Sequence, residues 1–120
     1  NDKSKKKDIQ NYKYIVTILK KTKNKGNIKD NNHKIVKFLI KIADIYETEQ
    51  NYKKIADTLK NAFLLDENNP KILDLLIESY INLKDKFMAE RTLKKMEEAN
   101  PENLKIIEFR DRIEKMFKKK

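Results

Sequence analysis

Two neighbouring segments of equal length decide the fold: VKFLIKIADIYETEQNYKKIADTLKNAFLLDENN, residues 36–69, and PKILDLLIESYINLKDKFMAERTLKKMEEANPEN, residues 70–103. They align without a gap at one constant spacing (70 − 36 = 34), which we term the repeat offset. It places apolar residues on apolar residues: Leu39 on Leu73, Ile42 on Leu76, Tyr46 on Tyr80, Leu59 on Leu93 and Ala62 on Met96. Within each segment the apolar residues recur every three or four positions, which is the spacing of one helix face. The pattern therefore predicts the same helical hairpin twice.

Polar residues set the predicted ends of the helices. The first segment predicts helices over about residues 33–49 and 51–65. Asn69 precedes Pro70, which suits a capping side chain followed by a proline at the first helical position, where a missing N–H does no harm. The pair Asn100-Pro101 repeats this arrangement, so we expect a closing helix over about residues 101–117. Its charged residues should face water: Arg110, Asp111, Arg112, Glu114 and Lys115.

The chain before the repeat is predicted to be less regular. Residues 1–7 contain no apolar side chain and predict a disordered basic lead-in. Residues 8–21 have apolar side chains at helical spacing and predict one helix, which would close the N-terminal end of the stack. Residues 22–32 contain the only glycine and four asparagines, and predict a linker. We therefore divide the chain into a basic N-terminal segment, residues 1–31, and a helical-repeat domain, residues 32–120.

The spacing of particular side chains inside the repeat resembles the tetratricopeptide repeat (TPR) family. The family pattern appears as Leu39-x2-Ile42-Ala43-x2-Tyr46 with Ile55-x3-Leu59 in the first unit, and as Leu73-x2-Leu76-Ile77-x2-Tyr80 with Ala89-x3-Leu93 and Pro101 in the second. The resemblance implies an all-α, right-handed solenoid of helical hairpins with about six helices, in which residues 36–69 and 70–103 are the two units. It also implies protein–protein binding as an adaptor or scaffold, without catalysis.

The resemblance further implies where a partner would bind, because the first helix of each TPR unit lines the concave face. The corresponding residues are Lys37, Ile40, Asp44 and Glu47 in the first unit, and Lys71, Asp74, Glu78, Ile81 and Asn82 in the second. The acids among them do not suit the clamp for a terminal carboxylate that some TPR domains form. We therefore expect a basic or apolar peptide or helix of another protein as the partner. A solvated face without a partner is the alternative.

Positive charge is concentrated in the first third of the chain. Residues 1–41 hold 13 Lys and three acids, so their net charge is 13 − 3 = +10, whereas residues 42–120 hold 16 groups of each sign. A solvated tail with a capping helix would explain this excess, and so would contact with a partner protein. The alternative function is a basic module associated with nucleic acid or an anionic membrane. Arg, which reads phosphates and bases best, is absent from residues 1–41, so we expect nucleic acid to be a poor partner. Peripheral membrane contact through the N-terminus and homo-oligomerisation remain open.

The residue types of an active site are scarce. The chain has no Cys, which excludes a disulfide scaffold and a thiolate zinc site. His33 is the only His and lies in a polar stretch without a visible partner for general-base catalysis. No phosphate-binding loop, HExxH or EF-hand pattern is present. We therefore predict no catalytic, cofactor-binding or metal-binding residue. The compartment stays open, because a cytoplasmic protein and an exported protein without disulfides would share these features.

Overall fold

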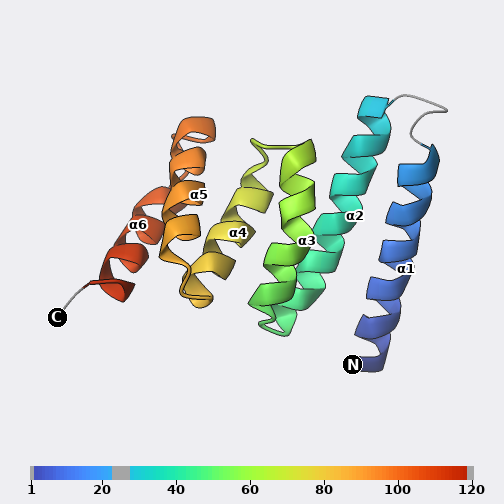
Figure 1. Ribbon diagram of the computed structural model, residues 1–120, viewed down its shortest axis with the longest axis horizontal. Helices are drawn as coiled ribbons and strands as arrows, with labels where there is room; N and C mark the ends of the chain where they lie inside the picture. Colours follow the sequence, from blue (N-terminus) through green and yellow to red (C-terminus); the bar gives the residue numbers. More distant parts are fainter. Residues whose placement is uncertain (1, 23–27, 119–120) are drawn as a thin grey trace. The chain divides into compact units, whose positions relative to one another are not determined.

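The computed structural model describes residues 2–22 and 28–118, and all regular secondary structure in these ranges is helical (Figure 1). The helices are α1 (Asp2–Thr22), α2 (Ile28–Thr48), α3 (Tyr52–Leu65), α4 (Pro70–Asn82), α5 (Lys86–Ala99) and α6 (Lys105–Met116). They divide into two compact units, Asn1–Glu67 and Asn68–Lys120. The predicted all-α fold with about six helices is confirmed for the described residues.

The first unit is built around α2, which packs against both α1 and α3, its antiparallel neighbours (Figure 1). Its core includes large aliphatic side chains that are at most 1% exposed: Ile35, Ile42, Ile55 and Leu59. Aromatic contact joins α1 to α2, because the rings of Tyr12 and Phe38 lie 5.7 Å apart. The ammonium group of Lys41 lies 5.9 Å from the centre of the Tyr12 ring. The predicted helix before the repeat therefore packs directly on the repeat's first helix.

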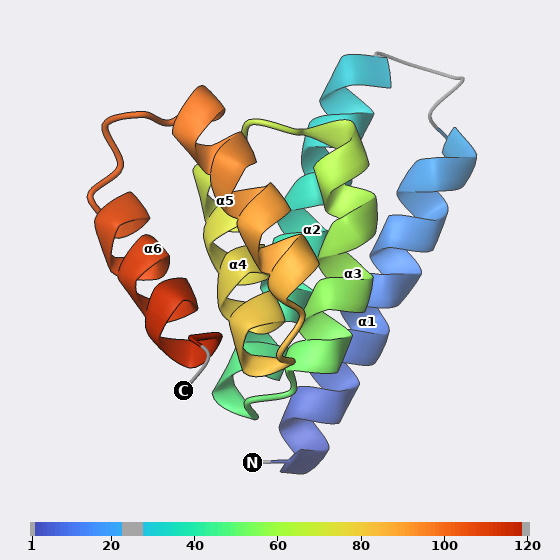
Figure 2. The same ribbon diagram turned by 60° about the vertical axis from the view of Figure 1, so that its left-hand side comes forward.

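In the second unit, α6 packs against both members of the α4–α5 hairpin (Figure 2). Helix α4 is buried on most of its surface, and its side chains Ile72, Leu73 and Ile77 are 0% exposed. Helix α6 contributes Ile106, Phe109 and Ile113 to the same core. Burying this much of one helix requires neighbours on more than one side, which the hairpin alone does not supply.

The turns of the two hairpins have the same construction. Two residues after the end of each first helix lies a non-glycine residue with positive φ, Gln50 at 54° and Lys84 at 62°. The next backbone N–H reaches back to a tyrosine carbonyl at 2.9 Å in both units, from Asn51 to Tyr46 and from Asp85 to Tyr80. A left-handed residue is a common way to satisfy the last carbonyls of a helix. Because 84 − 50 and 85 − 51 both equal 34, the backbone of the turn recurs at the repeat offset.

The second helix of each hairpin also begins in the same way. The side chain of Asn51 accepts a hydrogen bond from the N–H of Lys54, at 3.3 Å. The side chain of Asp85 accepts one from the N–H of Met88, at 3.1 Å. Each side chain satisfies an amide that has no partner inside its own helix.

Two helices begin earlier than predicted. Helix α1 begins at Asp2, so residues 2–7, expected to be disordered, are helical. Lys is a good helix former, and an acid in the first turn complements the helix dipole, so this segment lacks apolar residues but not helix propensity. Helix α2 begins at Ile28 with Asp30 in its first turn. The expected linker over residues 22–32 is therefore helical at both ends, and its remaining part lies outside the described residues.

The closing helix begins later than predicted, at Lys105. Asn100 ends α5, with its N–H donating to Met96 at 2.7 Å, and does not cap α6. Instead, the side chain of Asn103 accepts a hydrogen bond from the N–H of Lys105 at 2.9 Å. Asn69 does the same for the N–H of Lys71 at the start of α4, also at 2.9 Å. Asn103, one residue before the N-cap Leu104, thus repeats this hydrogen bond of Asn69 at the repeat offset, and Pro101 lies in the turn before α6.

The burial pattern predicts opposite outcomes for two leucines of α3. Leu59 is 0% exposed and Leu64 is 73% exposed. Leu59→Ala should lower the free energy of unfolding by about 2–5 kcal/mol, because it removes buried apolar atoms and leaves a cavity. Leu64→Ala is the matched control and should change it by less than about 0.5 kcal/mol. Urea unfolding followed by circular dichroism measures both changes. Equal losses would contradict the assignment of the core.

Candidate functional site

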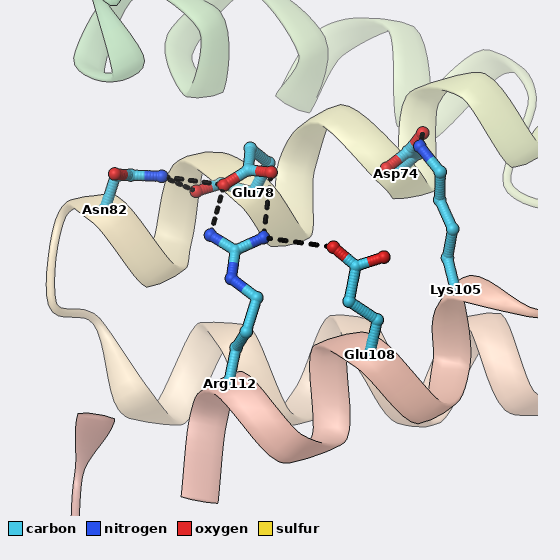
Figure 3. Close-up of polar contacts among 6 residues, drawn as sticks. All are labelled: Asp74, Glu78, Asn82, Lys105, Glu108 and Arg112. Atoms are coloured by element: carbon cyan, nitrogen blue, oxygen red, sulfur yellow. Dashed lines mark hydrogen bonds and ion pairs between the residues drawn. The ribbon is translucent and has the colours of Figure 1, made fainter. Parts of the chain in front are cut away.

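Two predicted groove residues, Asp74 and Glu78, lie one turn apart on α4, and each contacts a cation of α6 (Figure 3). The ammonium group of Lys105 lies 2.6 Å from Asp74 Oδ2. The guanidinium group of Arg112 binds the Glu78 carboxylate. The acids on this face are therefore paired with basic residues that lie two turns apart on the neighbouring helix.

The contact between Arg112 and Glu78 is bidentate. Nη1 donates to Oε1 at 3.0 Å and Nη2 donates to Oε2 at 2.5 Å. The two side chains are 34% and 30% exposed, so water still reaches part of the pair. Two parallel charge-assisted hydrogen bonds fix the orientation of both planar groups, which a single point contact would not do.

Three further residues surround this pair (Figure 3 shows two of them). The side-chain amide of Asn82 donates to Glu78 Oε2 at 2.8 Å. Glu108, one turn before Arg112, places Oε1 at 4.0 Å from Nη1. The guanidinium carbon also lies 5.8 Å from the centre of the Phe109 ring, within the range of a cation–π contact. Arg112 is therefore held from both helices.

The electrostatics of the site follow from these contacts. The hydrogen bonds from Arg112 lower the pKa of Glu78 below its usual value of 4.5, although partial burial acts in the opposite direction. The hydrogen bond to Asp74 raises the pKa of Lys105 above 10.5. Both shifts favour the charged forms of Glu78 and Lys105.

The helix starts explain why these residues meet. The side chains of Asn69 and Asn103 each accept a hydrogen bond from the N–H two residues further on, and Glu78 and Arg112 each follow that asparagine by nine positions (78 − 69 = 112 − 103 = 9). Equivalent positions on two neighbouring helices of a repeat lie at the same level of the stack. Arg112 was expected to face water, so the prediction was wrong for this residue. The signal that was overlooked is the pair of opposite charges separated by the repeat offset.

The predicted binding residues of the first unit lie along α2. Lys37 and Glu47 are exposed, whereas Ile40 and Asp44 are half-buried. This face therefore presents two accessible charges of opposite sign, and Ile40 and Asp44 lie between them in the sequence.

The remaining predicted residues of the second unit have different environments. Lys71 is exposed in the first turn of α4. Asn82 is exposed and bonded to Glu78. Ile81 is 1% exposed, so its side chain belongs to the core in this conformation. In this unit the structure thus brings together Asp74, Glu78 and Asn82, and adds the two α6 cations that the sequence did not single out.

An open pocket lies between α5 and α6. Its apolar lining residues are Leu93, Ile113 and Phe117. Its charged lining residues are four cations and four acids: Lys86, Arg110, Lys115, Lys118, Glu90, Glu97, Asp111 and Glu114. Arg110 and Glu97 pair with each other at 2.8 Å. The charges of the lining residues therefore sum to zero.

Within residues 2–22 and 28–118, no three His, Cys, Asp or Glu side chains are grouped so that they could hold a metal ion. No helix in these ranges is both long enough and apolar enough to cross a membrane. No family model matches the chain, and no curated protein sequence matches it. The function therefore has to be inferred from the geometry of the chain itself.

The paired site predicts a pH-dependent contribution to stability. Because the pKa of Glu78 is lowered on folding, the pair stabilises the fold above about pH 4.5, and this contribution disappears as the pH falls through the lowered pKa. Arg112→Gln should lower the free energy of unfolding by about 1–2 kcal/mol at pH 7. The difference from the unmodified protein should shrink below pH 4.5. Urea titrations at several pH values measure it.

Arg110→Gln is the matched control for this prediction. Arg110 also lies on α6 and pairs with Glu97, but through one contact with side chains 54% and 41% exposed. Its loss should lower stability by less than about 1 kcal/mol. A cost for Arg112→Gln that equals the control, or that does not change with pH, would contradict the assigned role of the bidentate pair.

Proposed function

We propose that this chain is a non-enzymatic protein–protein interaction module of the TPR type, which binds a helix or peptide of a partner protein. The main support is the recurrence of backbone detail at the spacing that is typical of the family. The positive-φ residue, the returning N–H and the capping side chain all recur at the repeat offset in the two hairpins. Such hairpins are building blocks of binding scaffolds because stacked helices present an extended face.

The contact between α4 and α6 indicates which ligand chemistry such a face accepts. Here, acids one turn apart on α4 hold Lys105 and Arg112, seven residues apart on a helix. A partner helix with cations at this spacing would match the same arrangement of acids. Within this chain, α6 already fills that role in the second unit. A partner would have to displace α6 or bind elsewhere.

The face of α2 is therefore the better candidate for a partner. At the repeat offset, Ile40 corresponds to Asp74 and Asp44 corresponds to Glu78, so the acid pair of α4 is replaced by one apolar and one acidic residue. Exposed Lys37 and Glu47 flank them. The chemistry that fits this row is an amphipathic helix with apolar residues and both signs of charge, placed to pair with Lys37 and Glu47.

A charge swap on α2 tests this proposal without changing the net charge. Lys37→Glu combined with Glu47→Lys should weaken capture of the partner by about tenfold or more, because two attractive contacts become repulsive. The full chain serves as bait in an extract of the cells that produce it, and quantitative mass spectrometry compares the proteins retained. Affinities are then measured with the purified partner.

The matched control swaps an exposed pair on α3, Lys53→Glu with Asp57→Lys, whose side chains are 72% and 50% exposed. It should retain the partner. If both variants, or neither of them, fail to retain the partner, the proposal that the partner binds to α2 is contradicted. Deleting residues 1–31 is a poorer test, because it removes α1 and exposes the side of α2 against which α1 packs. Replacing Asp74 and Glu78 with Lys would likewise be a poorer test, because it would break the ion pairs that these acids form with Lys105 and Arg112 of α6.

A further inference from the structure

The outer face of α1 combines exposed lysines with exposed apolar side chains. Lys3, Lys7, Tyr14, Ile18 and Lys21 are all exposed and follow one another at intervals of four, seven, four and three residues. At about 100° per residue, the three lysines lie within about 20° of Tyr14 around the helix axis, and Ile18 lies about 40° away. These five residues form a single stripe, which we term the α1 stripe.

The opposite side of α1 is occupied by its own unit. Ile9 and Val16 are buried, and Tyr12 packs against Phe38 of α2. On the stripe, by contrast, Tyr14 is 68% exposed and Ile18 is 41% exposed. One side of α1 therefore packs on α2. The other side presents lysines to the solvent, with Tyr14 and Ile18 between them.

The charge on α1 is strongly asymmetric. The helix contains seven lysines and two acids, so its net charge is 7 − 2 = +5. The two acids, Asp2 and Asp8, each lie about 120° around the helix from Tyr14, away from the stripe. In the described part of the chain, Lys3, Lys7 and Lys21 form no ion pair. The stripe is therefore a basic surface without internal neutralisation.

We propose that the α1 stripe binds the surface of an anionic lipid bilayer. Its lysines extend from Lys3 to Lys21, or about 27 Å of helix, which suits a flat charged surface better than a pocket. Lysine clusters on amphipathic helices are attracted to anionic lipids, and exposed Tyr and Ile side chains enter the headgroup region. Because α2 already holds α1, no ordering of a disordered segment has to accompany binding.

Nucleic acid fits the stripe less well. Single-stranded nucleic acid binds through stacking on several aromatic side chains, and Tyr14 is the one aromatic residue of the stripe, since Tyr12 contacts Phe38. Specific reading of bases in a duplex relies largely on Arg, Asn and Gln, whereas the charges here are all lysines. Lysine charges separated by an apolar centre match a lipid interface instead.

Vesicle sedimentation with the full chain tests the proposal. The protein should sediment with vesicles of phosphatidylcholine and phosphatidylserine, but not with phosphatidylcholine alone, and added salt should weaken the binding. Lys3→Gln, Lys7→Gln and Lys21→Gln together should weaken it about 100-fold, because each lysine near an anionic surface contributes about fivefold. Circular dichroism verifies that the variant remains helical.

The matched control removes three exposed lysines elsewhere, through Lys60→Gln, Lys86→Gln and Lys94→Gln. It should bind within about twofold of the unmodified protein if the stripe is the site. Tyr14→Ser should weaken binding several-fold at constant charge. Failure to bind the anionic vesicles, equal loss in the control, no effect of Tyr14→Ser, or tighter binding to duplex DNA at the same phosphate concentration would each overturn the proposal. The test does not involve Lys37 or Glu47, so it is independent of the proposed partner face.

Discussion

The constraint on which the second unit depends is that the α4–α5 hairpin alone cannot bury the whole apolar surface of α4. Helix α6 covers more of it, with Ile106, Phe109 and Ile113. At the repeat offset, three of its exposed positions are charged where α4 has buried apolar side chains: Arg110 replaces Leu76, Asp111 replaces Ile77 and Glu114 replaces Tyr80. Helix α6 thus resembles α4 on the side that meets the hairpin and differs from it on the side that meets water.

The ion pairs between α4 and α6 fix how α6 is placed along α4, which the apolar contact alone does not do. Apolar burial is non-directional and would tolerate a helix that slides along its axis. On α4, Asp74 pairs with Lys105 and Glu78 pairs with Arg112, and both pairs form at once only in this register of the two helices. Their partial exposure limits what they contribute to stability, so register is their main effect. The acidic character predicted for this part of the groove is therefore largely neutralised within the chain.

The spacing of apolar residues predicted the buried helix faces correctly where several positions of one helix followed the same pattern. The prediction of a helix start was wrong where it depended on one capping residue. The apolar residues matched at the repeat offset are buried in both units. The start of α6 was misplaced because Asn100-Pro101 and Asn103 both resemble helix starts, and only the backbone contacts distinguish them. The acids at positions 74 and 78 were identified, but their partners were not, because pairing depends on which side of α6 faces α4. Such information lies in tertiary packing and not in local propensity.

Charged residues and apolar residues follow different patterns along this chain. The apolar pattern recurs at the repeat offset, whereas the basic excess is confined to the first third. The core does not require this excess, because the lysines of the α1 stripe are exposed and lie opposite the side that packs on α2. The exposed side of α6, by contrast, carries charges of both signs. The proposed membrane contact of the α1 stripe and the proposed partner face on α2 lie in the same unit, and together they would make the chain an adaptor that holds another protein near an anionic membrane.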